Sequence, residues 1–177
     1  VLRYFESREA VLLELLDREF GGWLDGIGQA LEASPSPGAV PASQVDRLAS
    51  VMARAARERP LFCELLSNAA TVLEHNVSGE VAAAYKRGAL AHAARLMDLV
   101  ARVLPLGGAD ATVRVAGAVS LGVGGLWGMC RPSPGMEAAY LEHPELAVFR
   151  IDFEAALREY LEVLLTGLVS LRGRTEP

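Results

Sequence analysis

The sequence contains few isoleucine, lysine, cysteine and aromatic residues. Only 2 of its 177 residues are Ile and 6% are aromatic, whereas 28 are Ala and 27 are Leu. Sheet proteins draw on Ile, Val, Thr and aromatic residues, while Ala and Leu favour helices. The composition therefore disfavours an all-β sandwich or barrel and predicts an all-α protein. The hydrophobic fraction of 51% and the net charge of -5 exclude a largely disordered chain.

The cysteines, histidines and charges exclude further classes of protein. Cys63 and Cys130 form no CxxC pair, which favours a reducing compartment and a cytoplasmic protein. His75, His92 and His143 are too scattered for a helical metal-binding motif. The acidic net charge indicates that the chain has no overall basic surface for binding nucleic acid. The 16 Arg against a single Lys, together with the high Ala content, suggest a GC-rich bacterial genome.

The chain carries no recognisable catalytic or cofactor motif. Ser120 lacks the preceding glycine of a nucleophile elbow, and the stretch Gly122–Gly128 has Trp127 where a dinucleotide loop needs its third glycine. The longest weakly charged run, residues 115–130, is shorter than the roughly 20 residues that span a bilayer. We therefore expect no enzyme, no cofactor and no membrane insertion, and we interpret the run as a buried helix.

Polar capping residues and Pro/Gly breakers divide the chain into helices. Ser7, Ser78, Asp110 and Asp152 are candidate N-caps. Residues 34–41 are expected to form a linker, and residues 136–150 a loop with one short turn. The expected helices cover residues 8–33, 43–60, 60–76, 79–104, 110–131 and 153–172.

The last two long helices have properties that indicate a protein interface. Five glycines lie in the expected helix 110–131, and each costs roughly 1 kcal/mol relative to Ala. That repeated cost predicts close approach by another helix. We interpret the pair as half of an intermolecular four-helix bundle in a homodimer, and the alternative is burial within one chain. The expected interface residues are Ser120, Gly124, Gly128, Leu157, Leu161, Leu164 and Leu168.

Large side chains from four helices are candidates for the wall of one cavity. Binding pockets are mostly apolar with a few placed polar groups. His92 lies alone on an apolar stripe, so it is either such a polar group or a core histidine with hydrogen-bond partners. The set predicts a largely hydrophobic ligand. It comprises Phe20, Trp23, Phe62, Leu66, Tyr85, His92, Leu96 and Trp127.

The segment Val1–Leu16 (VLRYFESREAVLLELL) resembles the junction after the recognition helix in TetR-family transcriptional repressors. Arg8 replaces the usual Lys of that pattern, and Leu2 stands where the family usually has a phosphate-contacting Tyr. The matching positions are Tyr4, Phe5, Ser7, Glu9 and Leu12.

The resemblance implies a two-part organisation. Residues 1–7 would be the remnant of a helix-turn-helix domain whose other helices precede Val1, and residues 8–177 the ligand-binding and dimerisation domain. Tyr4 and Arg8 would contact operator phosphates. A small-molecule effector would shift the linker helix 8–33 and so control binding of the homodimer to double-stranded DNA. The alternatives are a helical small-molecule or lipid carrier, a scaffold without DNA function, and, with less support, a helical enzyme.

Overall fold

The computed structural model describes residues 6–33, 41–69, 73–104 and 109–172. Regular structure in these ranges is helical, without a strand, which confirms the predicted all-α class. The elements are α1 (Arg8–Ala33), α2 (Pro41–Arg57), α3 (Pro60–Asn68), η2 (Glu74–Asn76), α4 (Gly79–Ala101), α5 (Ala109–Met129), α6 (Pro134–Glu142), η3 (Pro144–Phe149) and α7 (Phe153–Arg172).

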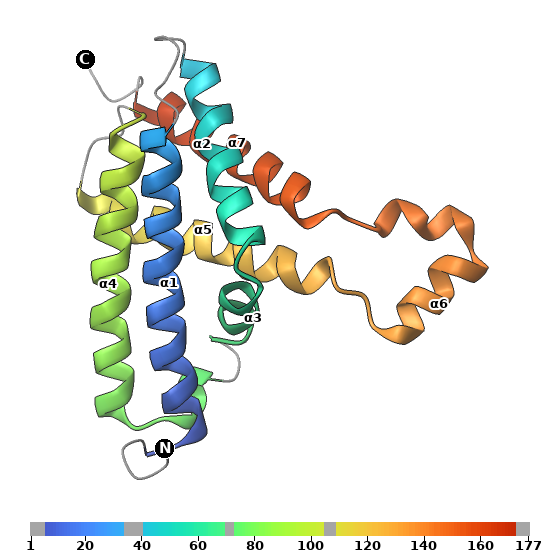
Figure 1. Cartoon of the computed structure of the whole chain (residues 1–177), viewed down its shortest axis with the longest axis horizontal. Helices are drawn as coiled ribbons and strands as arrows, with labels where there is room; N and C mark the ends of the chain where they lie inside the picture. Colours follow the sequence, from blue (N-terminus) through green and yellow to red (C-terminus); the bar gives the residue numbers. More distant parts are fainter. Residues whose placement is uncertain (1–5, 34–40, 70–72, 105–108, 173–177) are drawn as a thin grey trace.

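The long helices form two groups that cross each other. Helices α1 and α4 lie side by side along most of their length, α5 crosses them, and α7 crosses α2 (Figure 1). Helix α2 packs on α7, and α3 packs on α5. The connection between α5 and α7, made of α6 and η3, projects away from the rest of the molecule (Figure 1).

Three of the predicted N-caps are confirmed. The Ser7 hydroxyl accepts a hydrogen bond from the Ala10 backbone N–H at 3.0 Å, and the Ser78 hydroxyl accepts one from the N–H of residue 81 at 3.3 Å. Asp152 caps α7 in the same way, at 2.8 Å. The fourth prediction is wrong, because α5 begins at Ala109 and Asp110 lies within its first turn.

Three other predicted boundaries are also wrong. Helix α2 begins at Pro41, two residues before the expected start. Helix α3 ends at Asn68, and η2 is a separate turn. The expected loop 136–150 contains α6 and η3. The Ser133 hydroxyl caps α6, accepting from the N–H of residue 136 at 3.3 Å, and a proline follows it in the first turn, where its missing N–H costs nothing.

The core lies between α1, α2, α3, α4, α5 and α7, and the described residues include no buried polar or charged side chain. Trp23, Phe62 and Leu96 are fully buried there. The Trp23 indole N–H donates to the Met52 carbonyl at 3.3 Å, which satisfies its one donor.

Two glycines of α5 serve packing within the chain. A Cβ on Gly124 would lie 3.2 Å from the Leu66 carbonyl oxygen and from backbone atoms of Ser67, so this glycine lets α3 approach α5. A Cβ on Gly122 would meet the ring of Tyr160, whose hydroxyl donates to a carbonyl of α5 at 2.8 Å. At these two positions, burial within one chain explains the glycines.

Three other glycines of α5 face open space. A Cβ on Gly117, Gly125 or Gly128 would meet nothing within 4 Å. Leu121 lies between them on the helix and is 76% exposed. The uncovered small-residue face of α5 therefore runs through these positions.

Among the described residues, no single helix has the length and hydropathy of a membrane span, although 112–129 joined with α6, at a bend of 64°, passes the same test.

Candidate functional site

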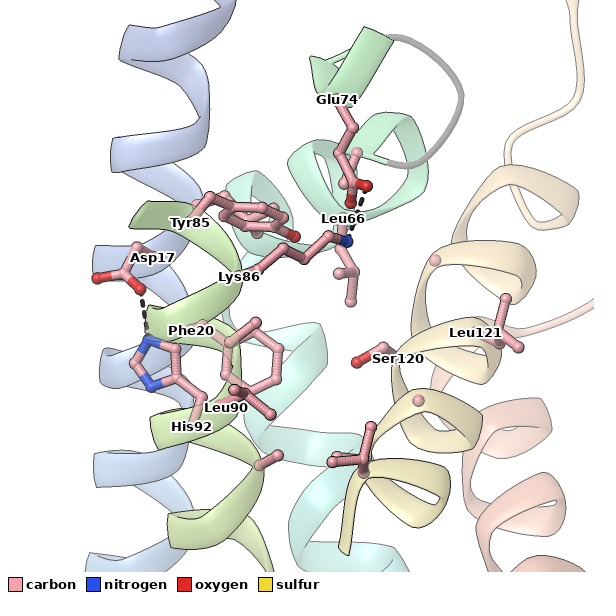
Figure 2. Close-up of a pocket in the computed structure, with 18 of the residues that line it drawn as sticks. Asp17, Phe20, Leu66, Glu74, Tyr85, Lys86, Leu90, His92, Ser120 and Leu121 are labelled. Atoms are coloured by element: carbon pink, nitrogen blue, oxygen red, sulfur yellow. Dashed lines mark hydrogen bonds and ion pairs between the residues drawn. The ribbon is translucent and has the colours of Figure 1, made fainter. Parts of the chain in front are cut away.

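A cavity of about 670 Å³ lies between α1, α3, α4 and α5 (Figure 2). Its size is typical of small-molecule sites, which measure roughly 300–1,000 Å³. Most of its wall is apolar, and a few polar side chains are set into it. The lining residues are Leu16, Asp17, Phe20, Leu66, Ser67, Ala69, Glu74, Tyr85, Lys86, Ala89, Leu90, His92, Ala93, Val113, Ala116, Gly117, Ser120, Leu121, Gly124 and Gly125.

Four of the predicted pocket residues line this cavity. They are Phe20 from α1, Leu66 from α3, and Tyr85 and His92 from α4. Figure 2 shows these side chains around one space, with Ser120 of α5 opposite them. Sequence reasoning assigned Ser120 to the dimer interface, and the structure instead places it in the cavity wall.

The other four predicted pocket residues do not line the cavity. Trp23, Phe62 and Leu96 are fully buried in the core. Trp127 points toward α3 and α7, where its indole N–H donates to Glu64 at 2.9 Å. Large apolar residues on one helical stripe divide between core and pocket according to which neighbouring helix they meet, and periodicity does not reveal this.

Phe20 connects the cavity wall to the core. Its ring stacks on the His92 imidazole, with centroids 4.9 Å apart and planes 10° from parallel. On its other sides it meets Phe62 and Trp23 edge-on, at 5.2 and 5.5 Å. Two predicted pocket residues thus support the wall from behind.

His92 is held by a carboxylate from another helix. Its Nε2 lies 3.0 Å from Asp17 Oδ1, and its side chain is 17% exposed. Gly88 makes this approach feasible, because a Cβ there would collide with the Asp17 carboxylate. The two sequence alternatives for His92 therefore combine: it has a hydrogen-bond partner and it also faces the cavity.

The remaining polar groups form a second cluster at the cavity. Lys86 Nζ lies 2.8 Å from Glu74 Oε2, which joins α4 to η2. Burial, together with the charges of Glu74 and Asp17, raises the pKa of Tyr85 to about 12. Its hydroxyl therefore stays protonated at neutral pH and acts as a hydrogen-bond donor or acceptor.

Sequence reasoning missed Asp17, Glu74 and Lys86. Each carries a charge, and no sequence pattern gives any of them a role. The pairings also link positions far apart in sequence, 75 apart for His92 and Asp17. One available signal was Gly88, which precedes His92 by four residues and so shares its helix face.

The predicted DNA-side residues lie at the beginning of the chain. Tyr4 is outside the described residues. Arg8 is the first residue of α1 and is exposed. Close by, the Glu6 carboxylate accepts a hydrogen bond from the Ser78 backbone N–H at 2.7 Å, which lowers the pKa of Glu6. This bond joins the entrance of α1 to the start of α4.

Several predicted interface residues are already covered within one chain. Leu157 and Leu161 are fully buried in the core and present no surface to a partner. Gly124 packs against α3. These three assignments are wrong because α7 and α5 turn these positions inward.

Three predicted interface residues retain some exposure. Leu164 and Leu168 are partly buried against the core, and Gly128 is exposed. These positions stay as proposed interface residues.

A second hollow, of about 860 Å³, lies along α1 and α2. Its wall carries Arg47, Arg54 and Arg59 with Glu19 and Glu58. Arg59 lies 3.1 Å from Glu19, and Arg47 donates to the carbonyl of residue 31 at 2.9 Å. The wall of this hollow has a larger polar share than that of the first cavity, and its arginines already have partners, so the first cavity is the better site for an apolar ligand. The described residues contain no group of three or more His, Cys, Asp or Glu that could hold a metal ion.

Comparison with models of protein families gives a match over most of the chain. A family model described as tetracyclin repressor-like, C-terminal domain, matches residues 17–171. The chain belongs to this family. It is thus a TetR-family regulator, in agreement with the resemblance at the N-terminal segment, and the family is regulatory and not catalytic. A comparison with curated proteins gives no match.

Proposed function

We propose that this chain is the effector-binding and dimerisation domain of a TetR-like transcriptional repressor in the cytoplasm. An apolar small molecule in the cavity would control the binding of the dimer to operator DNA. The observation that carries the proposal is the apolar cavity whose wall includes the Asp17–His92 pair between α1 and α4. In TetR-like proteins, the helix that corresponds to α1 of this chain continues from the DNA-binding head.

The chemistry of the wall supports a largely hydrophobic effector. Phe20, Leu66 and Leu90 provide apolar contact area. The hydroxyls of Tyr85 and Ser120 are available to orient a ligand with one or two polar groups. The carboxylates of Asp17 and Glu74 and the amine of Lys86 also line the cavity. A polar group on the ligand therefore competes with the existing pairs that these residues form.

A chain of contacts links the cavity to the beginning of α1. Lys86 holds Glu74 of η2, and Ser78 directly follows the residue after η2. The Ser78 N–H then binds Glu6. We propose that a ligand which displaces Glu74 or Asp17 shifts α1 by this route. The ligand must bind the DNA-incompetent arrangement more tightly, because only differential affinity moves a conformational equilibrium.

On the DNA side we propose that Tyr4 and Arg8 bind backbone phosphates. Arg8 lies in the first turn of α1, where free backbone N–H groups also favour an anion. Such contacts position a protein without reading the sequence, so Arg8→Ala in a protein that carries the proposed DNA-binding head should weaken binding to all DNA sequences alike.

Ligand binding is tested by thermal shift and native mass spectrometry with a library of apolar compounds. A ligand at 100 times its Kd stabilises the protein by about 2.7 kcal/mol. Ser120→Phe fills the cavity and should abolish the shift. Ser50→Phe adds the same ring at the second hollow and should leave the shift unchanged.

The competing function is a helical carrier or scaffold without a DNA partner. In that case ligand binding would survive, but a protein with the proposed DNA-binding head would select no operator from a random DNA pool. Equal ligand binding by wild type and the Ser120→Phe variant would contradict the proposed cavity.

A further inference from the structure

The segment Pro134–Phe149, made of α6 and η3 and called the arm below, leaves its large apolar side chains exposed. It projects from the ends of α5 and α7 (Figure 1), and its two helices contact each other. None of its residues is buried. Leu141, Val148 and Phe149 are 74%, 77% and 61% exposed.

The arm nevertheless has a defined internal structure. The Ser133 cap fixes the start of α6, and Arg150 pairs with Glu137 while its guanidinium lies 5.6 Å from the Tyr140 ring centroid. A segment of this length cannot bury its own apolar side chains. A preformed helix pair that leaves large apolar side chains in water is typical of an interaction surface.

A second copy of the chain is the occupant that the surrounding surface favours. The arm connects α5 to α7, and both helices have uncovered outer faces. Leu121 on α5 and Val163 on α7 are 76% and 70% exposed, and a Cβ on Gly125 or Gly167 would meet nothing within 4 Å. A two-fold interface uses the same surface of both copies, so when two such faces meet, the projecting arm of each chain is available to contact the other.

The cavity is continuous with the same face. Gly117, Leu121 and Gly125 belong to the uncovered face of α5 and also line the cavity. Val113 and Leu90, further lining residues, are 58% and 55% exposed. One subunit alone therefore leaves one side of its ligand site open to water.

We propose that the arm of each subunit packs over the rim of the partner subunit's cavity and completes its wall. Leu141 and Val148 supply the apolar contacts. The inference rests on the proposed ligand site, and it adds that each site is assembled from two chains.

The direct test is photo-cross-linking of the whole 177-residue chain. A benzophenone amino acid replaces Leu141, and in a control variant it replaces Leu61, which is 46% exposed on α3 beside the second hollow. Mixing ¹⁵N-labelled with unlabelled protein distinguishes cross-links between copies from those within one. We expect mixed-isotope cross-links from position 141 to the α4–α5 rim. Cross-links confined to one copy, cross-links elsewhere, or none would overturn the proposal.

Charge substitutions give an independent measurement. Leu141→Glu and Val148→Glu alter exposed positions and should leave the circular dichroism spectrum unchanged. Each should raise the dimer dissociation constant in sedimentation by at least about tenfold, a free-energy change of about 1.4 kcal/mol. Leu61→Glu, with the same change in charge, should leave dimerisation unchanged. Unaltered dimerisation in both arm variants would refute the arm contact.

Binding of the neutral apolar dye Nile red separates failure of the arm from failure of the proposed function. If the wild-type chain binds the dye in the cavity and the arm variants bind it equally well, the ligand site stands and its completion by a partner is wrong. If the arm variants weaken dimerisation and wild type binds no apolar probe, the arm contact stands and the proposed effector site fails.

Discussion

The imidazole of His92 and the carboxylate of Asp17, 3.0 Å apart, join two helices along one side of the cavity. Asp17 is 41% exposed, so solvent screens much of the attraction. The pair matters more for geometry than for stability. It holds the His92 ring flat against Phe20, and the stacked pair forms part of the wall that a ligand would meet.

A double-mutant cycle measures this pair. His92→Phe retains an aromatic ring over Phe20 and removes the hydrogen bond, and Asp17→Ala removes the carboxylate. The coupling free energy from urea unfolding should be about 0.5 kcal/mol, at the lower end of the range for a side-chain hydrogen bond because Asp17 is partly exposed. Additive effects of the two substitutions would contradict an energetic link between α1 and α4 here.

Gly124 should be intolerant of a side chain. In Gly124→Ala the new methyl group meets the Leu66 carbonyl and the Ser67 backbone at 3.2 Å, and backbone yields less readily than a side chain. We expect a loss of roughly 1 kcal/mol in unfolding free energy, after the gain of about 1 kcal/mol from the higher helix propensity of Ala.

Gly79 provides the matched control. It lies at the start of α4, where a Cβ would meet nothing within 4 Å. Gly79→Ala should leave the unfolding free energy unchanged or raise it by a few tenths of a kcal/mol. If Gly124→Ala is equally benign, the close packing of α3 on α5 is wrong.

The two cysteines should differ in reactivity. Cys63 is fully buried, its thiol donates to the Ala56 carbonyl at 3.3 Å, and desolvation raises its pKa to about 12. Burial also raises the pKa of Cys130, but that residue is partly exposed. Since the thiolate is the reactive form, a disulfide reagent at pH 8 should titrate Cys130 in the native protein and both thiols in denaturant. Rapid reaction of both thiols without denaturant would exclude the buried position of Cys63.

Tyr85 should make stability fall at alkaline pH. Its folded-state pKa of about 12 exceeds the ordinary value of 10.0, so its neutral form is favoured by folding. This contribution is fully present below pH 10 and is lost as the pH rises through 12, because the unfolded chain ionises first. Unfolding free energies of wild type and Tyr85→Phe should therefore converge or cross between pH 10 and 12. Cys63 titrates in the same window but is common to both proteins, so the difference isolates Tyr85. Parallel curves would contradict the burial of this hydroxyl.

The sequence predicts the helices better than it predicts their neighbours. The starts of α1, α4 and α7 follow from Ser7, Ser78 and Asp152, because a capping side chain acts on a backbone N–H only a few residues away. The start of α6 is predictable in the same way, since Ser133 precedes a proline. Such local signals require no knowledge of tertiary contacts.

The cavity depends on contacts that a single helix does not encode. Trp23 and Phe20 lie three residues apart on α1, yet the first is core and the second lines the cavity. Leu157 and Ser120 were assigned to an interface because an apolar or small-residue stripe looks the same whether its partner is internal or external. The register of α5 against α3 and α7 decides which stripe stays open.

The hydrogen bond between Glu6 and Ser78 provides a test at the junction of the proposed DNA-binding head. Acceptance from the Ser78 N–H lowers the pKa of Glu6 below its ordinary value of 4.5. A lowered folded-state pKa means that the bond stabilises the protein above pH 4.5 and is lost as the pH falls through the folded-state value. The Ser78 amide resonance in an NMR titration should move with a midpoint below 4.5, and Glu6→Gln should abolish that movement. Glu9→Gln, one turn further along α1, is the control and should leave the midpoint unchanged. An apolar ligand that acts through η2 should raise the midpoint toward 4.5 as the bond loosens, whereas a midpoint insensitive to bound ligand would rule out this route from the cavity to α1.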